Sequence, residues 1–192
     1  KSATYGARTE VKLSWNKNTL YPGLDYKHEA TENISMTMPP SMPMRDGTAW
    51  QDAHINQFGW FNEYQYAFHN SKLVLSLRLD VNEANAKDLS NLFKTMYGDA
   101  KSQDFNHNIS IGYNQNLTKN SQIGIWAGRA QRSGSITERF INRFAVGIDA
   151  YELVGNPNIK PETNNQVDLI YTYKRENIYL QADIFYAYLQ NY

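Results

Sequence analysis

Residues 58–80 read FGWFNEYQYAFHNSKLVLSLRLD, two alternating runs separated by a short polar turn. In the first run aromatic side chains occupy every second position except Asn62, with Glu63 and Gln65 between them. In the second run leucine occupies every second position, and Ser76 and Arg78 lie between the leucines. Because successive side chains of a strand point to opposite faces, the pattern predicts a β-hairpin with one apolar and one polar face.

The same alternation recurs along the chain and predicts about eight long strands between residues 9 and 190. The strands are joined alternately by short and long connections. The short ones are rich in residues that form turns easily: Asn16-Lys17-Asn18-Thr19, Asn70-Ser71-Lys72, Thr118-Lys119-Asn120-Ser121 and Lys174-Arg175-Glu176-Asn177. The long ones cover about 30–53, 82–103 and 133–162 and hold nearly all the proline.

Tight turns at one end and long loops at the other are typical of an outer-membrane barrel wall. The predicted fold class is therefore all-β: a transmembrane, antiparallel up-and-down β-barrel with short periplasmic turns and long extracellular loops. About eight strands would form part of a larger barrel. A soluble β-sandwich with its apolar face inward is the alternative, but runs of about ten to fourteen residues exceed the usual strand length of such proteins.

The alternation assigns an environment to each side chain. The apolar positions would face lipid, and Asn62 is an exception for which the sequence offers no explanation. Aromatic residues near the turns are predicted to form an interfacial girdle: Trp15, Tyr66, Phe68 and Tyr173. The polar positions predicted to face the lumen carry charges: Asp25, Lys27, Glu63, Arg78, Asp80, Asp168 and Asp183.

Composition excludes several classes of protein. The 192 residues carry a formal net charge of zero, so no broad cationic surface points to nucleic acid as a partner. No apolar run is long enough for a membrane-spanning helix. The absence of cysteine excludes disulfides and thiolate chemistry. The first residues lack the pattern of a signal peptide, so we expect the chain to begin partway through a larger protein.

Two segments carry a resemblance to a known family. Thr137-Glu138-Arg139-Phe140, followed by Gly155-Asn156-Pro157-Asn158-Ile159-Lys160-Pro161-Glu162, resembles the late barrel region of TonB-dependent outer-membrane receptors. Weaker matches occur at Gly23-Leu24-Asp25-Tyr26-Lys27-His28 and Leu77-Arg78-Leu79-Asp80. Ser2-Ala3-Thr4-Tyr5-Gly6-Ala7-Arg8 and Trp50-Gln51-Asp52 are similar to the copper-receptor branch of that family.

The resemblance implies a nutrient importer of the bacterial outer membrane. Members of the family are 22-stranded barrels that enclose a plug and take up scarce nutrients with force from a periplasmic TonB-type coupling protein. Residues 1–192 would be part of a single barrel domain, surrounded by outer-membrane lipid, with the plug and the final strands absent from this chain. The lumen charges would then pair with one another or with the plug. No catalytic residue or catalytic cofactor is expected.

A methionine-rich stretch within the first long loop suggests the cargo. Four of the five methionines lie in nine residues: Met36, Met38, Met42 and Met44. Thioethers are soft ligands suited to Cu(I), and His28 and His54 flank the loop as further candidate ligands. These six residues are the predicted metal site, with copper ion as the transported ligand. The alternative is that flexible methionines fill gaps between the loop and its neighbours.

Other functions stay open at this level. The imported nutrient could instead be an iron chelate or another small molecule. A non-transport barrel, acting as an adhesin or an enzyme, could use the same wall, but no zinc-protease, phosphate-loop or nucleophile-elbow motif occurs. His69 and His107 are predicted to be interfacial or solvated rather than ligands.

Overall fold

A computed structural model describes residues 2–32, 51–142, 144–145 and 152–191. Most of them form one antiparallel sheet in the order β1-β3-β4-β5-β6-β7-β10-β11, with β2 also paired to β3. The strands are β1 Ser2–Glu10, β2 Leu13–Trp15, β3 Asn18–Thr31, β4 Ala53–Phe68, β5 Ser71–Ala86, β6 Lys101–Asn116, β7 Ser121–Arg132, β10 Glu162–Arg175 and β11 Ile178–Gln190. Consecutive strands are neighbours throughout, which confirms the predicted up-and-down topology.

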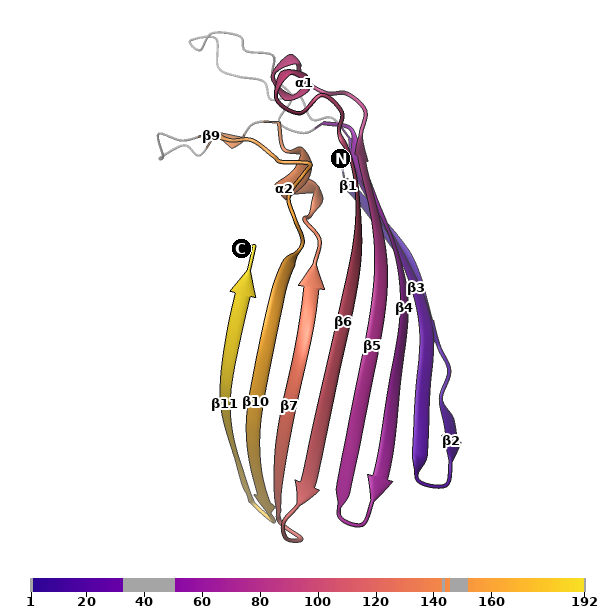
Figure 1. The fold of residues 1–192 in the computed structure, drawn as a ribbon, viewed down its shortest axis with the longest axis vertical. Helices are drawn as coiled ribbons and strands as arrows, with labels where there is room; N and C mark the ends of the chain where they lie inside the picture. The colour runs from indigo at the N-terminus through magenta and orange to yellow at the C-terminus, as the bar shows by residue number, and fades with distance from the viewer. Residues whose placement is uncertain (1, 33–50, 143, 146–151, 192) are drawn as a thin grey trace.

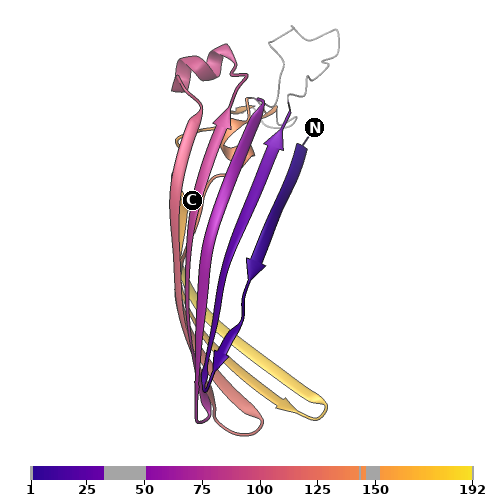
Figure 2. The same cartoon turned by 90° about the vertical axis from the view of Figure 1, so that its right-hand side faces the viewer.

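The tight turns lie at one end of the curved wall, and the long connections lie at the other (Figures 1 and 2). The loop end carries helix α1 Asn91–Tyr97, helix α2 Ile136–Phe140 and a small hairpin of β8 Phe144–Ala145 and β9 Glu152–Leu153. In the described part of the chain, no helix is long and apolar enough to cross a membrane.

The first strand begins earlier than predicted and is interrupted once. Pairing with β3 already starts at Ser2, and the register runs on from Glu10 opposite Gly23 to Leu13 opposite Leu20. Between these points Val11 donates its N–H to the carbonyl of Pro22 at 3.0 Å, but proline has no N–H to return. β1 and β2 are therefore one strand whose ladder Pro22 breaks.

The turns are tight, as predicted, but shorter or shifted by a residue, since β3 already begins at Asn18 and β10 continues to Arg175. Asn16, His69 and Glu176 adopt positive φ angles of 51°, 50° and 35° at the start of three of them. The turn predicted at residues 70–72 instead consists of His69 and Asn70, because Ser71 already pairs with Phe68. A residue with positive φ at this position matches the twist of a hairpin.

The second long loop is shorter than predicted and contains a helix. β5 continues to Ala86 and β6 begins at Lys101, so only the residues between them form the connection. The Ser90 side chain caps α1 by accepting from the Phe93 N–H. The packed core lies here, where both helices meet the inner side of β4 and β5: Ala53, Ile55, Ala84, Ala86, Phe93, Ala100, Ile136 and Phe140.

The two faces of the wall differ as the alternation predicted. The outer face, opposite the helices, leaves Leu75, Ile111 and Leu169 exposed by 40%, 49% and 40%. These side chains do not meet in a sealed interior, as the soluble alternative with its apolar face inward would require. Near the turns, the rings of Tyr66 and Phe68, two residues of the predicted girdle, stack with centroids 5.3 Å apart. Asn62, the polar exception among the apolar positions, lies on the outer register as predicted. Its buried Oδ1 has no hydrogen-bond partner among the described residues.

Candidate functional site

A charge cluster lies at the middle of the inner face. Arg78 on β5 donates to both carboxylate oxygens of Asp25 on β3, at 2.6 and 3.0 Å. The same guanidinium donates to both oxygens of Asp80, at 2.8 and 2.5 Å. The Asp80 side chain is only 4% exposed, and it also accepts from the amides of Gln57 and Asn108, at 3.2 and 3.3 Å. One arginine therefore neutralises two carboxylates on the wall.

A glycine makes the cluster possible. Gly59 on β4 pairs with Asp25 on one side and Asp80 on the other, so it lies between them on the inner face. A Cβ at this position would lie 2.4 Å from Asp25 Oδ1 and 2.6 Å from Arg78 Nη2. The missing side chain is thus the space that the guanidinium occupies.

An aromatic ring sits beside the cluster. Phe61 is nearly buried on the inner face, and Arg8 lies over its ring at 4.2 Å from the centroid. Arg78 lies at 5.9 Å from the same centroid. Gly23 provides the room, since a Cβ there would lie 2.1 Å from Phe61 Cζ. Two cations are therefore held beside one ring, an arrangement that favours both.

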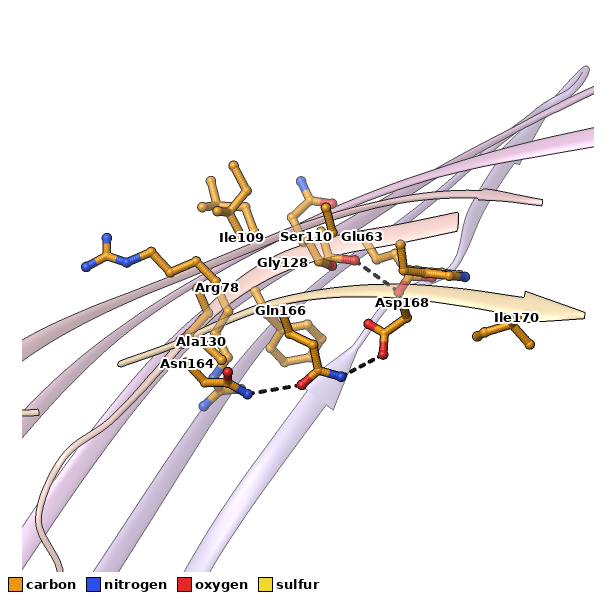
Figure 3. A pocket seen from close by; sticks show the side chains of 18 residues that line it. Glu63, Arg78, Ile109, Ser110, Gly128, Ala130, Asn164, Gln166, Asp168 and Ile170 are labelled. Carbon is orange, nitrogen blue, oxygen red and sulfur yellow. Dashed lines mark hydrogen bonds between the residues drawn. The ribbon is translucent and has the colours of Figure 1, made fainter. Parts of the chain in front are cut away.

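Towards the turns, the inner face forms a hollow of about 490 Å³ (Figure 3). Polar side chains from β4, β5, β6 and β10 line it beside apolar ones such as Phe61 and Trp126, and several of the polar groups bond one another. Asn164 donates to Gln166 at 3.2 Å, and Gln166 donates to Asp168 at 2.7 Å (Figure 3). On the other side, Ser76 donates to Glu63 at 3.3 Å. The hollow could bind a polar ligand or a polar protein segment, because its amides and carboxylates offer both donors and acceptors.

Helix α2 is fastened to the loop end by a buried arginine. Arg139 is 1% exposed and donates to the carbonyls of Gly134 and Pro157 at 3.0 and 2.7 Å. It also donates to Ser102 on β6 at 2.6 Å and forms an ion pair with Asp104. Burial lowers the pKa of Arg139, and Asp104 opposes that shift. The segment that resembles the receptor family is therefore the one that holds α2 against β6.

Glu138 closes the start of the same helix. Its carboxylate accepts from Arg132 at 2.9 Å and from the Ser135 N–H at 2.7 Å, and the Ser135 hydroxyl caps the Glu138 N–H. Arg132 bridges onward to Glu162 at the start of β10. Hydrogen bonds from Arg132 and Ser135 lower the pKa of Glu138 to about 2, against the opposing effect of burial. Glu138 is therefore ionised at any physiological pH.

The two histidines of the predicted metal site lie close together, with ring centroids 6.0 Å apart. Both belong to the outer register, because His28 pairs with Asn56 and His54 lies two residues earlier on β4. His28 Nδ1 lies 2.7 Å from Asn56 Oδ1, which also accepts from Tyr26. Since that oxygen only accepts, His28 donates from Nδ1, and Nε2 is the ring nitrogen that this contact leaves available.

His54 is a neutral imidazole at the loop end of β4. A strand crosses the apolar part of a bilayer in about nine to eleven residues, so counting from Tyr66 near the turn places His54 beyond it. Burial lowers the pKa of His54, and the neighbouring His28 and Lys87 lower it further. A neutral ring with a lone pair is the form that binds a transition metal.

The methionine part of the predicted site lies outside the described residues, since Met36, Met38, Met42 and Met44 fall within residues 33–50. In the described ranges, no group of three or more His, Cys, Asp or Glu is arranged to hold a metal ion. The metal site therefore stays a prediction. The structure gives positions for its two histidines but describes none of its four methionines.

Other predicted residues fall where the alternation put them. The charges expected in the lumen are on the inner register, and Lys27 pairs with Glu29 in the same strand. His69 lies in a turn, as expected, with φ of 50°. His107 is not isolated, because Arg129 bonds its Nε2 on the outer face.

The sequence alone did not point to a role for Arg8 or Arg129, or to the bonds by which Arg139 holds α2 against β6. Arg129 had a detectable signal, since it follows Ile125 and Ala127 at alternate positions and so carries a charge on the apolar register. Arg139 had none, because its partners lie on distant segments.

Comparison with known proteins places this wall in a family. The family model described as "TonB dependent receptor-like, beta-barrel" matches residues 1–192. No curated protein matches the sequence. Two solved structures are similar: the copper transporter OprC, with 18% identity and a TM-score of 0.77, and the FrpB iron transporter from Neisseria meningitidis (F3-3 variant), with 13% identity and a TM-score of 0.69.

The similarity covers 100% and 98% of this chain but only 31% and 29% of the respective transporter. The chain thus spans about a third of either protein's length, and at these identities the similarity establishes the shared fold. The family match over all 192 residues establishes more: the chain belongs to the TonB-dependent receptor β-barrel family.

Proposed function

We propose that this chain is a section of the barrel wall of an outer-membrane receptor that imports a scarce nutrient. The observation that carries the proposal is the family match over residues 1–192, joined to a wall with an apolar outer face and a charged inner face. Transport through such a wall requires a wet interior, and the charge cluster of Asp25, Arg78 and Asp80 on the inner face is suited to one.

The remaining parts of the receptor belong to the same proposal. A plug would fill the lumen, where the hollow lined by Gln166 and Asp168 offers hydrogen-bonding groups to it. A TonB-type protein would supply the force through that plug. The sheet is open on both sides, since β1 pairs only with β3 and β11 only with β10 in the described chain, so further strands would complete the barrel. The role is transport and not catalysis.

Copper is the leading cargo. The supporting features are the methionine-rich stretch at residues 36–44 and the His28–His54 pair at the base of its loop. His28 keeps Nε2 available and the lowered pKa of His54 keeps that ring neutral, so both rings are ready to bind a metal. The likeness to the copper transporter OprC agrees with this cargo.

An iron chelate is the second candidate. The supporting observation is the hollow of about 490 Å³, whose mixed lining of apolar side chains, amides and carboxylates suits a small organic chelate better than a bare soft ion. The likeness to the FrpB iron transporter agrees with it.

The experiment uses the intact receptor. Cu(I) and Cu(II) are titrated into the purified protein and into a variant in which Met36, Met38, Met42 and Met44 are changed to leucine. We expect the Cu(I) affinity to fall at least tenfold. The matched control is Met96→Leu, because Met96 is an exposed methionine on α1 outside the predicted site, and its loss should leave the affinity unchanged.

Two further variants test the histidine part. His28→Gln and His54→Gln should each weaken copper binding, while His69→Gln in the turn should not. Uptake of copper by cells is then measured with and without the energy-coupling protein. If the copper affinity is unchanged in all of these variants, the loop site is refuted. If copper uptake is the same with and without the coupling protein, the proposed importer is refuted.

A further inference from the structure

The outer face carries very few charges. On the outer register of the main sheet, the described strands hold four charged side chains: Glu83, Lys101, Arg129 and Arg175. Arg175 lies beside the turn at the end of β10, and Glu83 and Lys101 lie near the loops. Arg129 is different, because it lies between Ile109 and Asn165 on neighbouring strands, part of the way down the wall from the loop end.

Among the described residues, no carboxylate neutralises Arg129. In the part of the chain that the structure describes, its contact is with His107, where an Arg129 N–H donates to Nε2. A guanidinium only donates, so His107 accepts at Nε2 and keeps its proton on Nδ1. The pair therefore presents the remaining guanidinium N–H groups and one imidazole N–H, all of them donors, on a face that meets lipid.

A groove begins at this pair. The outer face holds a hollow of about 790 Å³ that Arg129 lines together with apolar side chains such as Trp60, Leu77, Ile111 and Val167. Ala127 explains the depth, because this short side chain lies between the longer Ile111 and Val167 on the neighbouring strands. The result is an apolar trough with a cationic group on the side nearest the loops.

From this geometry we infer that the outer wall binds a phosphorylated, acylated glycolipid of the outer leaflet. Its phosphate binds Arg129 and the His107 N–H, and one of its acyl chains lies in the trough. Charge complementarity carries the assignment, since a phosphate supplies the anion that no side chain of the described wall provides for Arg129. The inference rests on the proposed place of the receptor in the outer membrane, where the loop end meets the outer leaflet.

The test uses the intact receptor, stripped of lipid in detergent. Binding of purified lipid A, of dephosphorylated lipid A and of phosphatidylglycerol is measured by native mass spectrometry. We expect lipid A to bind at least tenfold more tightly than its dephosphorylated form. The Arg129→Gln variant should lose that preference, and His107→Phe, which lacks the ring N–H, should reduce it.

The matched control is Arg175→Gln, which removes an exposed cation of the same outer register at the turn end and should leave binding unchanged. Melting temperatures of all variants are compared, so that loss of folding is not read as loss of binding. Equal binding of both lipid A forms, or equal loss in the Arg175 and Arg129 variants, would overturn the inference. A receptor that fails to import copper or iron but keeps the phosphate preference would refute the proposed cargo alone.

Discussion

Arg78 and Asp25 are 53 residues apart in sequence and form a two-bond ion pair across the wall, with N–O distances of 2.6 and 3.0 Å. The pair passes over β4, which lies between their strands and offers only Gly59 at that level. It ties β3 to β5 through side chains, in addition to the backbone ladder. Asp80 shares the same guanidinium, so three charges act as one unit.

Replacing Arg78 with leucine should destabilise the barrel by roughly 3 kcal/mol, because the nearly buried Asp80 loses its cationic partner and keeps only the amide donors of Gln57 and Asn108. Urea unfolding of the receptor in lipid vesicles measures the change. Arg78→Lys keeps the positive charge but lacks the several N–H donors of the guanidinium. It should therefore restore only part of the lost free energy of unfolding. A leucine variant as stable as the wild type would contradict the idea that the cluster supports the wall.

Gly59→Ala should cost about 1 to 3 kcal/mol, because the new Cβ would occupy the place of the guanidinium. Gly128→Ala is the control, since its nearest contact would be a looser 3.2 Å to Ser110 Cβ. In the background of Arg78→Leu the cost of Gly59→Ala should shrink, and the same urea experiment measures this coupling. Additive effects would show that Gly59 acts independently of Arg78.

Arg139→Leu should release α2 from β6, because the substitution removes the donors to Pro157 and Ser102 and leaves Asp104 unpaired. We expect cleavage within residues 133–161 by added protease to become at least tenfold faster in receptor-containing membranes. Lys94→Leu on the exposed side of α1 controls for the loss of a cation. Unchanged cleavage in the Arg139 variant would mean that other contacts hold the segment.

The contacts of Glu138 with Arg132 and Ser135 should weaken only at acidic pH. Its folded pKa of about 2 lies below the ordinary value of 4.5, so its contribution is complete above about pH 4.5 and disappears as the pH falls towards 2. The protease assay, run with an acid-active enzyme between pH 6 and pH 2, should show cleavage rising over that window. Glu138→Gln should be cleaved faster already at pH 6, with a flatter pH dependence.

Two adjacent residues of β5 test which face meets lipid. Leu75→Lys places a charge on the outer face and should cost about 2 to 4 kcal/mol near the bilayer midplane. Ser76→Lys places the same charge on the inner face, next to Glu63, and should cost much less. Folding into vesicles under urea measures both, and equal costs would contradict the assignment of faces.

Alternation of side chains in the sequence determined the strands, their order and their two faces. That information is local, because a strand places every second side chain on the same side whatever its partners are. The Leu73–Leu79 run and the polar turn before it were therefore enough to predict the hairpin with β4, within one residue at the turn. The interruption at Pro22 could not be predicted from the sequence alone. It depends on the strand register, which places Val11 opposite the proline that lacks an N–H.

Only the tertiary structure decided the contacts between distant segments. Arg78 meets Asp25 and His107 meets Arg129 because strand register and shear bring them together, and no spacing along one strand encodes that offset. Arg139 meets Asp104 because helix α2 packs against β6. The helices α1 and α2 were missed for a related reason: they are short and are stabilised by packing against Ala53 and Ala84 rather than by their own periodicity. The strands of a β-barrel wall can thus be predicted from local alternation, whereas its sites depend on how separate segments are aligned in the fold.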